Sequence, residues 1–143
     1  MSDSVIEAKV INAPIESVYK TLSDFEKYSE FIKEISKVEI LEKLSDGSQI
    51  VRFHADIIKE FSYDLHMKCK PFDSITWTFV RGDVFKENQG TWIFEKIDEK
   101  RTKATYSLKA NFGVFVPKMI VTKILSQNLP KMFEAIEKRS ISL

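Results

Sequence analysis

The sequence predicts an α+β fold in which one antiparallel sheet of seven strands curls around a long C-terminal helix. Three observations predict this fold. Apolar and polar residues alternate with a period of two at residues 4–11 and through most of residues 38–112. Short turns separate the alternating segments, which implies that the strands are antiparallel neighbours. Apolar residues take helical spacing after the first strand and again at residues 117–139.

The N-terminal part of the chain predicts one strand and two short helices. The strand at residues 4–11 is expected to be half-buried, because its apolar side chains share one face. These side chains are Ile6, Ala8 and Val10. Pro14 favours the start of a helix, since its missing N–H costs nothing in the first turn. Ser23 and Glu26 have the spacing of a capping box, which predicts a second short helix.

Residues 38–112 predict six further strands. The turn at residues 45–48 is typical of a hairpin, and Pro71 ends a strand because it cannot donate a ladder hydrogen bond. We interpret Gly90 as a bulge or a close-packing position. Aromatic side chains fall on one face of these strands and mostly polar ones on the other, so one face is buried and the other meets water.

The aromatic face predicts a cavity. Seven strands about 4.8 Å apart span roughly 30 Å, whereas one helix is about 10–12 Å wide. The sheet must therefore curl, and its interior stays partly open unless the aromatic side chains fill it. The residues are consistent both with an open interior and with one that the aromatic side chains fill. The inner-face aromatics are Phe53, Phe61, Tyr63, Trp77, Phe79, Trp92, Phe94, Tyr106 and Phe112.

The predicted C-terminal helix is apolar on two sides, so it has two apolar neighbours. One is the sheet, and the other is the ligand space, the short helices, a membrane or a protein. Pro130 predicts a kink near Ser126, where a hydrogen bond is lost. The preceding loop Phe112–Val116 is apolar and is followed by Lys118 and Lys123. We hypothesise that it forms the cavity mouth and touches a membrane transiently; packing on the first helix is the alternative.

Composition excludes several classes of protein. The chain has 143 residues, which suits a single domain at 1–143, and its net charge of +1 gives no general attraction to DNA. The single cysteine, Cys69, excludes an internal disulfide and fits a reducing compartment. We see no signal-peptide pattern and no apolar run long enough to span a membrane. A cytoplasmic location is the expectation.

The chain shows no recognisable catalytic, metal-binding or phosphate-binding motif. By strand parity, His54 and His66 fall on the wet face. We therefore expect no catalytic residue, no metal and no cofactor. The polar groups expected inside are Tyr63, Tyr106 and Cys69, with Arg81 near the end of its strand. A buried tyrosine hydroxyl needs a partner, and a ligand oxygen is one candidate beside water and backbone.

In several segments the chain resembles the START-like, helix-grip (SRPBCC) superfamily. The resemblance covers nearly the whole chain and is closest to the polyketide cyclase/dehydrase and coenzyme-Q-binding-type branch. It implies a seven-stranded sheet wrapped around a C-terminal helix and enclosing a hydrophobic cavity. Ser29 departs from the pattern, because many relatives carry proline there. The resemblance is carried by residues 11–14, Val18, residues 23–28, Phe31, residues 82–83, residues 90–94, Thr102, Tyr106, Leu108 and residues 116–118.

These features lead to three functional hypotheses. The first is a non-catalytic carrier for a hydrophobic small molecule, a lipid or an isoprenoid quinone. The second is a polyketide cyclase or aromatase. The third is a ribosome- or protein-interaction module, because the resembling branch also contains a ribosome-associating toxin. In this chain, the basic patch for such an interaction would comprise Arg52, Lys68, Lys70, Arg101, Lys103 and Lys109. The residues expected to bind the ligand are Phe53, Tyr63, Leu65, Trp77, Phe79, Arg81, Trp92, Phe94, Tyr106, Leu108, Phe115, Ile120 and Ile124.

Overall fold

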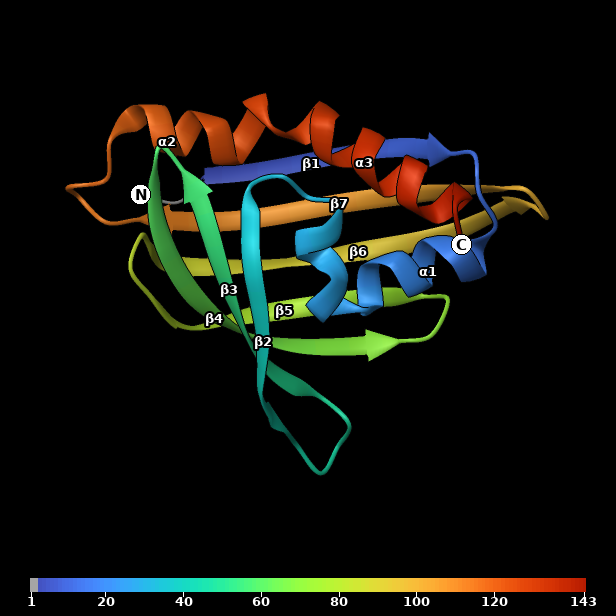
Figure 1. Ribbon diagram of the computed structural model, residues 1–143, viewed down its shortest axis with the longest axis horizontal. Coiled ribbons are helices and arrows are strands. Elements are labelled where there is room, and N and C mark those ends of the chain that lie inside the picture. Colours follow the sequence, from blue (N-terminus) through green and yellow to red (C-terminus); the bar gives the residue numbers. More distant parts are fainter. Residues whose placement is uncertain (1–2) are drawn as a thin grey trace.

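The fold is the predicted one: a seven-stranded antiparallel sheet that wraps around C-terminal helical segments (Figure 1). It is seen in a computed structural model that describes residues 3–143. The strands follow the order β1-β7-β6-β5-β4-β3-β2 across the sheet. Their bounds are β1 (Asp3–Ile11), β2 (Ile35–Lys43), β3 (Gln49–Ile57), β4 (Lys59–Lys70), β5 (Ser74–Gly82), β6 (Phe85–Asp98) and β7 (Arg101–Phe112).

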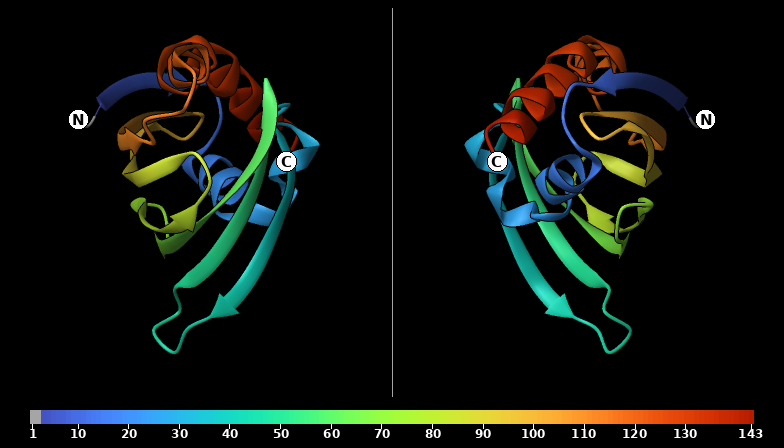
Figure 2. Two further views of the ribbon diagram at one scale, coloured as in Figure 1. Left: turned by 90° about the vertical axis from the view of Figure 1, so that its left-hand side faces the viewer. Right: turned by 90° about the vertical axis from the view of Figure 1, so that its right-hand side faces the viewer.

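The helices lie on the concave face of the sheet. The end-on views show the strands as a curved wall with the helices inside its bend (Figure 2). Two short helices, α1 (Ile15–Ser23) and η1 (Phe25–Glu30), follow β1. The C-terminal segments are α2 (Lys118–Thr122), η2 (Lys123–Gln127) and α3 (Leu129–Ile141).

The apolar face predicted for the first strand is wrong. Ile6 and Val10 are 73% and 49% exposed, whereas Ile11 at the end of β1 is fully buried. The register explains this: Glu7 lies opposite Tyr106, which faces the interior, so Ile6 and Val10 belong to the outer face of the sheet. As an edge strand, β1 has a sheet neighbour on one side only, and the alternation alone does not say which of its faces meets the core.

Arg81 lies on the outer face of the sheet, so its predicted place in the interior is also wrong. Leu65 pairs with Phe79 and Asp64 pairs with Arg81, which leaves one extra residue, Val80, in β5. Such a bulge shifts the strand by one residue and reverses the facing of the residues after it. Arg81 instead donates to the buried carboxylate of Asp64, with 2.7 Å between Nε and Oδ2.

Asp64 holds a second arginine on the same outer face. Arg52 of β3 approaches it with 2.8 Å between Nε and Oδ1 and 3.0 Å between the second nitrogen and Oδ2. The carboxylate therefore joins three neighbouring strands, β3, β4 and β5, through charge-assisted hydrogen bonds. This cluster is separate from the interior.

The predicted kink near Ser126 is confirmed, and it divides the helix into three segments rather than bending one. Pro130 has no N–H to give to the Ser126 carbonyl. The backbone upstream widens into the π-helical η2, in which the Asn128 N–H reaches the Lys123 carbonyl at 3.1 Å. As a result, the chain around residues 124–132 turns the side chains of Ile124, Asn128 and Met132 toward the interior.

The short helices are held by contacts other than the predicted capping box. Neither α1 nor η1 has a side-chain cap, and Asp24 rather than Ser23 precedes η1. The Tyr28 hydroxyl donates to the Leu22 carbonyl and fixes η1 against α1. Ser140 of α3 donates to Thr21 of α1 at 3.0 Å, which ties the two helices together in the core.

Within residues 3–143, no helix combines the length and the apolar character needed to cross a membrane.

Candidate ligand-binding cavity

A cavity of about 180 Å³ lies between the concave face of the sheet and the C-terminal helices. A single water molecule needs a cavity of only about 10–15 Å³, so this cavity has room for a small organic ligand. The walls are predominantly apolar. The lining residues are Tyr28, Ile32, Glu34, Ile35, Phe53, Ala55, Ile57, Phe61, Tyr63, Leu65, Met67, Trp77, Phe85, Asn88, Trp92, Tyr106, Leu108, Ile124, Asn128, Leu129 and Met132.

Two aromatic clusters form separate parts of the wall. In the first, the ring of Tyr106 lies 4.9 Å from that of Trp92 and 5.9 Å from that of Trp77. In the second, the ring of Tyr63 lies 5.5 Å from Phe53 and 5.1 Å from Phe85. Rings locked against one another in this way make a rigid wall, because each has few rotamers left.

Two glycines make room for these aromatic side chains. Gly90 is paired with Trp77, and a Cβ on it would lie 2.5 Å from the indole ring and 2.2 Å from the Ser107 carbonyl. Gly82 is paired with Tyr63, and a Cβ there would lie 2.6 Å from the tyrosine Cβ. These distances are far below van der Waals contact. The close-packing interpretation of Gly90 is thus confirmed.

Trp77 fixes one polar group of the wall. Its indole nitrogen donates to the Asn88 side-chain oxygen at 3.0 Å. Since an indole N–H can only donate, the amide orientation is determined: the oxygen faces Trp77 and the nitrogen is free to donate elsewhere. Asn88 lines the cavity, so this amide nitrogen is available to a ligand.

The phenols of Tyr63 and Tyr106 are further donors in the wall. Burial raises the pKa of Tyr63 above that of an ordinary phenol, and burial together with the nearby Tyr63 raises the pKa of Tyr106. Both side chains are therefore neutral near pH 7 and can donate an O–H. Within residues 3–143 neither hydroxyl has a hydrogen-bond partner. Every fully enclosed side-chain polar atom of these residues does have one, so the two hydroxyls must face open space.

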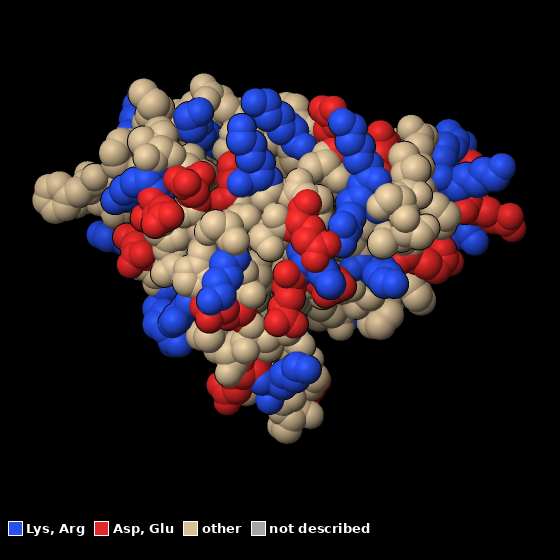
Figure 3. Space-filling view, in the orientation of Figure 1, with Lys and Arg blue, Asp and Glu red and all other residues tan. Residues whose placement is uncertain are grey.

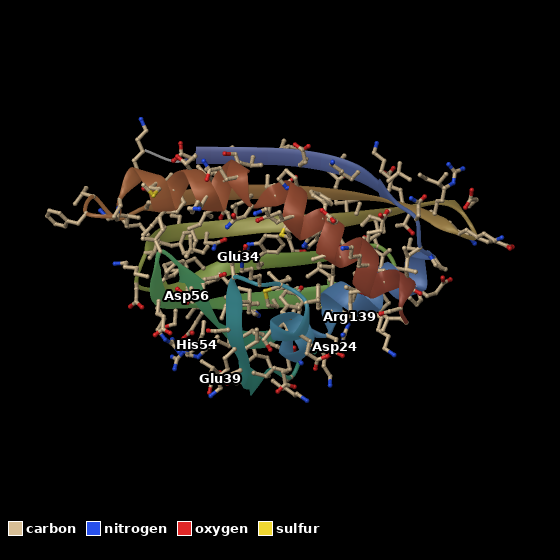
Figure 4. All side chains as sticks on the ribbon, turned by 45° about the horizontal axis from the view of Figure 1, so that its top comes forward. Asp24, Glu34, Glu39, His54, Asp56 and Arg139 are labelled. Carbon is tan, nitrogen blue, oxygen red and sulfur yellow. The ribbon has the colours of Figure 1, made fainter. Side chains whose placement is uncertain are left out.

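The lining of the cavity includes one carboxylate residue, Glu34. Glu34 precedes β2 and lines the cavity together with Asn128 and Leu129 from the C-terminal segments. In Figure 4, Glu34 lies between the sheet and these helices, whereas Asp56, His54 and Glu39 lie along the outer edge of the sheet. Among the described residues, the lining includes no Lys, Arg or His.

The structure brings together eight of the residues expected to bind the ligand and places five elsewhere. The eight on the cavity wall are Phe53, Tyr63, Leu65, Trp77, Trp92, Tyr106, Leu108 and Ile124. Arg81 is on the outer face, and Phe115 is 96% exposed. Phe94 packs against Tyr19 of α1, with ring centroids 6.0 Å apart. Ile120 is buried in the core and Phe79 is half-buried against the core, and neither lines the cavity.

Several wall residues were not anticipated because they come from outside the strand alternation. Tyr28, Ile32 and Glu34 belong to η1 and the loop after it, and no period links them to the sheet. Asn88 follows a register shift between β6 and β7, so parity does not place it. The short hairpin between Trp77 and Asn88 was the signal in the sequence that could have placed Asn88 near the wall.

The two histidines lie on the outer side of the sheet, as strand parity predicts. The His54 Nε2 is 2.7 Å from a Glu39 carboxylate oxygen, and the His66 Nε2 is 2.7 Å from the Ser48 hydroxyl. Within the described part of the chain, no three His, Cys, Asp or Glu side chains cluster closely enough to hold a metal ion.

Comparison with known proteins extends the description. The sequence model of the family described as polyketide cyclase / dehydrase and lipid transport matches residues 11–137. No curated protein matches the chain in sequence. Among solved structures, the Zhui aromatase/cyclase from Streptomyces sp. R1128 is 18% identical, with a TM-score of 0.87 over 99% of this chain and 94% of that one.

Two further structures are similar. A START superfamily protein from Mycobacterium smegmatis is 22% identical, with a TM-score of 0.84 over 97% of each chain. Human STARD10 is 15% identical, with a TM-score of 0.78 over 97% of this chain and 63% of that one. At these identities the likeness establishes the fold, which is the helix-grip arrangement that the sequence resemblance predicts.

Proposed function

Because the chain belongs to the polyketide cyclase / dehydrase and lipid transport family, we propose that it is a non-catalytic carrier for a hydrophobic small molecule. The candidate ligands are a lipid or an isoprenoid quinone, held between the sheet and the C-terminal helices. The observation that carries this proposal is the cavity itself: an apolar, aromatic wall with a few unpartnered donors. This is the usual composition of a small-molecule site.

The apolar wall supplies the binding energy. Burial of about 200 Å² of apolar ligand surface is worth about 5 kcal/mol before the costs of association. Because the rings of Trp77, Trp92 and Tyr106 already pack against one another, little side-chain entropy is lost on binding.

Native mass spectrometry after mild purification tests the carrier proposal. We expect a population of the protein that carries an apolar small molecule, or that takes one up from a panel of neutral lipids and quinones. Recovery of protein without any such ligand, together with no uptake from the panel, would contradict it.

We also propose that one end of the molecule touches membranes while the ligand is exchanged. Val114 and Phe115, between β7 and α2, are 80% and 96% exposed, and Met119 in α2 is also exposed. The turn between β3 and β4 lies at the same end and exposes Ile58 (Figure 1). Figure 3 shows this end as an uncharged projection with charged side chains close behind it. Lys118 supports attraction to anionic lipids.

The membrane proposal is tested by co-sedimentation with vesicles that contain anionic lipid. Phe115→Asp is expected to reduce the bound fraction several-fold, because it places a charge where apolar insertion is needed. Ile141→Asp is the matched control: Ile141 is 59% exposed but lies near the C-terminus. Equal binding of both variants and the wild type would contradict a membrane role for this loop.

The second candidate function is a cyclase or aromatase acting on a polyketide-like chain. Two neutral phenols, Tyr63 and Tyr106, facing the cavity favour it, because they could donate to a substrate carbonyl as an aldol ring closure proceeds. Incubation with a poly-β-ketone thioester separates the two functions: cyclised product formed faster than without protein supports catalysis, and binding without turnover supports carriage.

The ribosome-interaction hypothesis has weaker support. Four of the six basic side chains of the predicted patch are neutralised locally. They form the ion pairs Arg52–Asp64, Lys70–Asp73, Arg101–Asp98 and Lys103–Glu95. Co-sedimentation with ribosomes at low salt tests it, and absence of the protein from the pellet would remove it.

A further inference from the structure

The cavity is built to exclude negative charge. Its lining among residues 3–143 contains no Lys, Arg or His and includes one acidic residue, Glu34. An anion that entered would lose its hydration and gain no opposite charge, which is strongly unfavourable in a low-dielectric interior. A ligand carboxylate or phosphate inside the cavity would also be repelled by Glu34.

Apart from Glu34, the polar side chains of the wall can all donate a hydrogen bond, although the phenol oxygens and the Asn128 amide can also accept one. The Asn88 amide nitrogen is turned away from Trp77 by the indole bond, and the hydroxyls of Tyr63 and Tyr106 face open space. Donors without partners are satisfied by an acceptor on the ligand. A carbonyl oxygen meets this requirement without carrying charge, and the apolar ring or chain attached to it would contact the aromatic clusters.

We propose that the part of the ligand enclosed by this cavity is uncharged, carries a carbonyl-type acceptor that meets Tyr63, Tyr106 or Asn88, and cannot be a carboxylate or a phosphate. The inference rests on the proposed function and sharpens it to a ligand class: neutral ketones, quinones or esters. Free fatty acids, whose carboxylate would have to be enclosed, are outside that class.

Three naphthalenes with different substituents at the same position test the proposal. A neutral fluorescent ketone, 6-propionyl-2-(dimethylamino)naphthalene, is the reporter. It is displaced by 2-acetylnaphthalene, by 2-naphthoate or by 2-ethylnaphthalene at pH 7. We expect the ketone to bind at least about tenfold more tightly than the carboxylate, and about three- to tenfold more tightly than the ethyl compound, which lacks the acceptor.

Variants assign the effect to particular side chains. Tyr63→Phe and Tyr106→Phe are expected to lower affinity for the ketone about three- to tenfold in at least one of the two, with no change for the ethyl compound. Glu34→Gln is expected to improve naphthoate binding. Glu42→Gln removes an exposed carboxylate away from the cavity and should leave it unchanged.

The outcomes separate the inference from the proposed function. If naphthoate or 2-ethylnaphthalene binds as tightly as the ketone, the ligand class is wrong while the carrier function stands. If none of the three compounds displaces the reporter and the reporter itself does not bind, both are overturned. The comparison among the three compounds uses the wild-type protein, so it does not depend on the variants folding.

Discussion

Two glycines determine where the aromatic side chains of the cavity wall lie. Gly90 and Gly82 stand opposite Trp77 and Tyr63 on neighbouring strands. A methyl group at either position would overlap its partner. The flat indole of Trp77 can therefore lie over Gly90 and donate to the Asn88 side chain. Gly90 thus sets the position of the Trp77 indole N–H in the cavity wall.

Gly90→Ala is expected to destabilise the protein by about 1–3 kcal/mol, because the new methyl group meets both an indole ring and a backbone carbonyl that cannot move freely. Gly113→Ala is the control: its Cβ would find only ordinary contacts, the nearest at 3.6 Å, and we expect a change below about 0.5 kcal/mol. Urea unfolding measures both. A similar small change in the two variants would contradict the packing described for Trp77.

Three tyrosines of the interior predict loss of stability at alkaline pH. Burial raises the pKa values of Tyr28, Tyr63 and Tyr106 above the value of about 10 expected in the unfolded chain. Below pH 10 the phenols are protonated in both states, and their contribution is constant. Above it the unfolded state binds fewer protons than the folded state, so the free energy of unfolding falls by up to about 1.4 kcal/mol per pH unit for each tyrosine.

Denaturant unfolding at several pH values from 8 to 11.5 measures this slope, and absorbance at 295 nm follows tyrosinate formation. The double variant Tyr63→Phe and Tyr106→Phe should flatten the dependence. Ionisation of all tyrosines near pH 10 in the folded protein, before any unfolding, would contradict the raised pKa values of these phenols.

Strand parity found much of the cavity wall from the sequence because it needs only alternation within a strand. It placed Phe53, Tyr63 and Trp77 correctly. It failed for Arg81, where a bulge at Val80 reverses the facing. It could not reach Tyr28 or Glu34, since residues outside a strand have no parity, and their place depends on how η1 packs against the sheet.

At the scale of elements, the interruption of a helix could be predicted from the sequence, but the buried face of an edge strand could not. Pro130 predicts the interruption of the C-terminal helix, because its missing N–H is a local property of the sequence. The outward turn of Ile6 in β1 is not local: it depends on which face of the neighbouring β7 meets the core. The Ser23–Glu26 spacing likewise does not form its cap, because the Tyr28 hydroxyl secures this corner instead.

The turn between β3 and β4 holds a strained residue. Ile58 has a φ of 69°, a left-handed conformation that a β-branched side chain adopts at a cost of about 1–3 kcal/mol. Ile58→Gly should therefore stabilise the protein, by about 1 kcal/mol after the added entropy of the unfolded chain.

Ile6→Gly is the comparison variant, and it is expected to lower the free energy of unfolding rather than raise it. Ile6 is also exposed but lies in the regular strand β1, where glycine costs about 0.5–1 kcal/mol. Thermal unfolding of both variants gives the two signs. Destabilisation by Ile58→Gly as large as that by Ile6→Gly would argue against a strained turn at this end of the molecule.

At the scale of the whole molecule, a wide sheet and a narrow helix explain the cavity. The sheet wraps around the C-terminal segments (Figure 2). The aromatic side chains of the inner face do not fill the space between the sheet and these segments. The sequence left open whether those side chains fill the interior, because filling depends on the curvature of the sheet. The structure resolves this in favour of a cavity with aromatic walls and donor groups.

The most direct test of this account is a fluorescence titration of the neutral naphthalene ketone into the wild type, Ala55→Phe and Ala8→Phe. Ala55 lines the cavity, so a phenyl ring there occupies the ligand space, whereas Ala8 is exposed on β1. We predict saturable one-to-one binding with blue-shifted emission in the wild type and Ala8→Phe, and binding at least about tenfold weaker in Ala55→Phe. Equal binding by all three proteins would show that the ligand does not enter this cavity and would contradict the account.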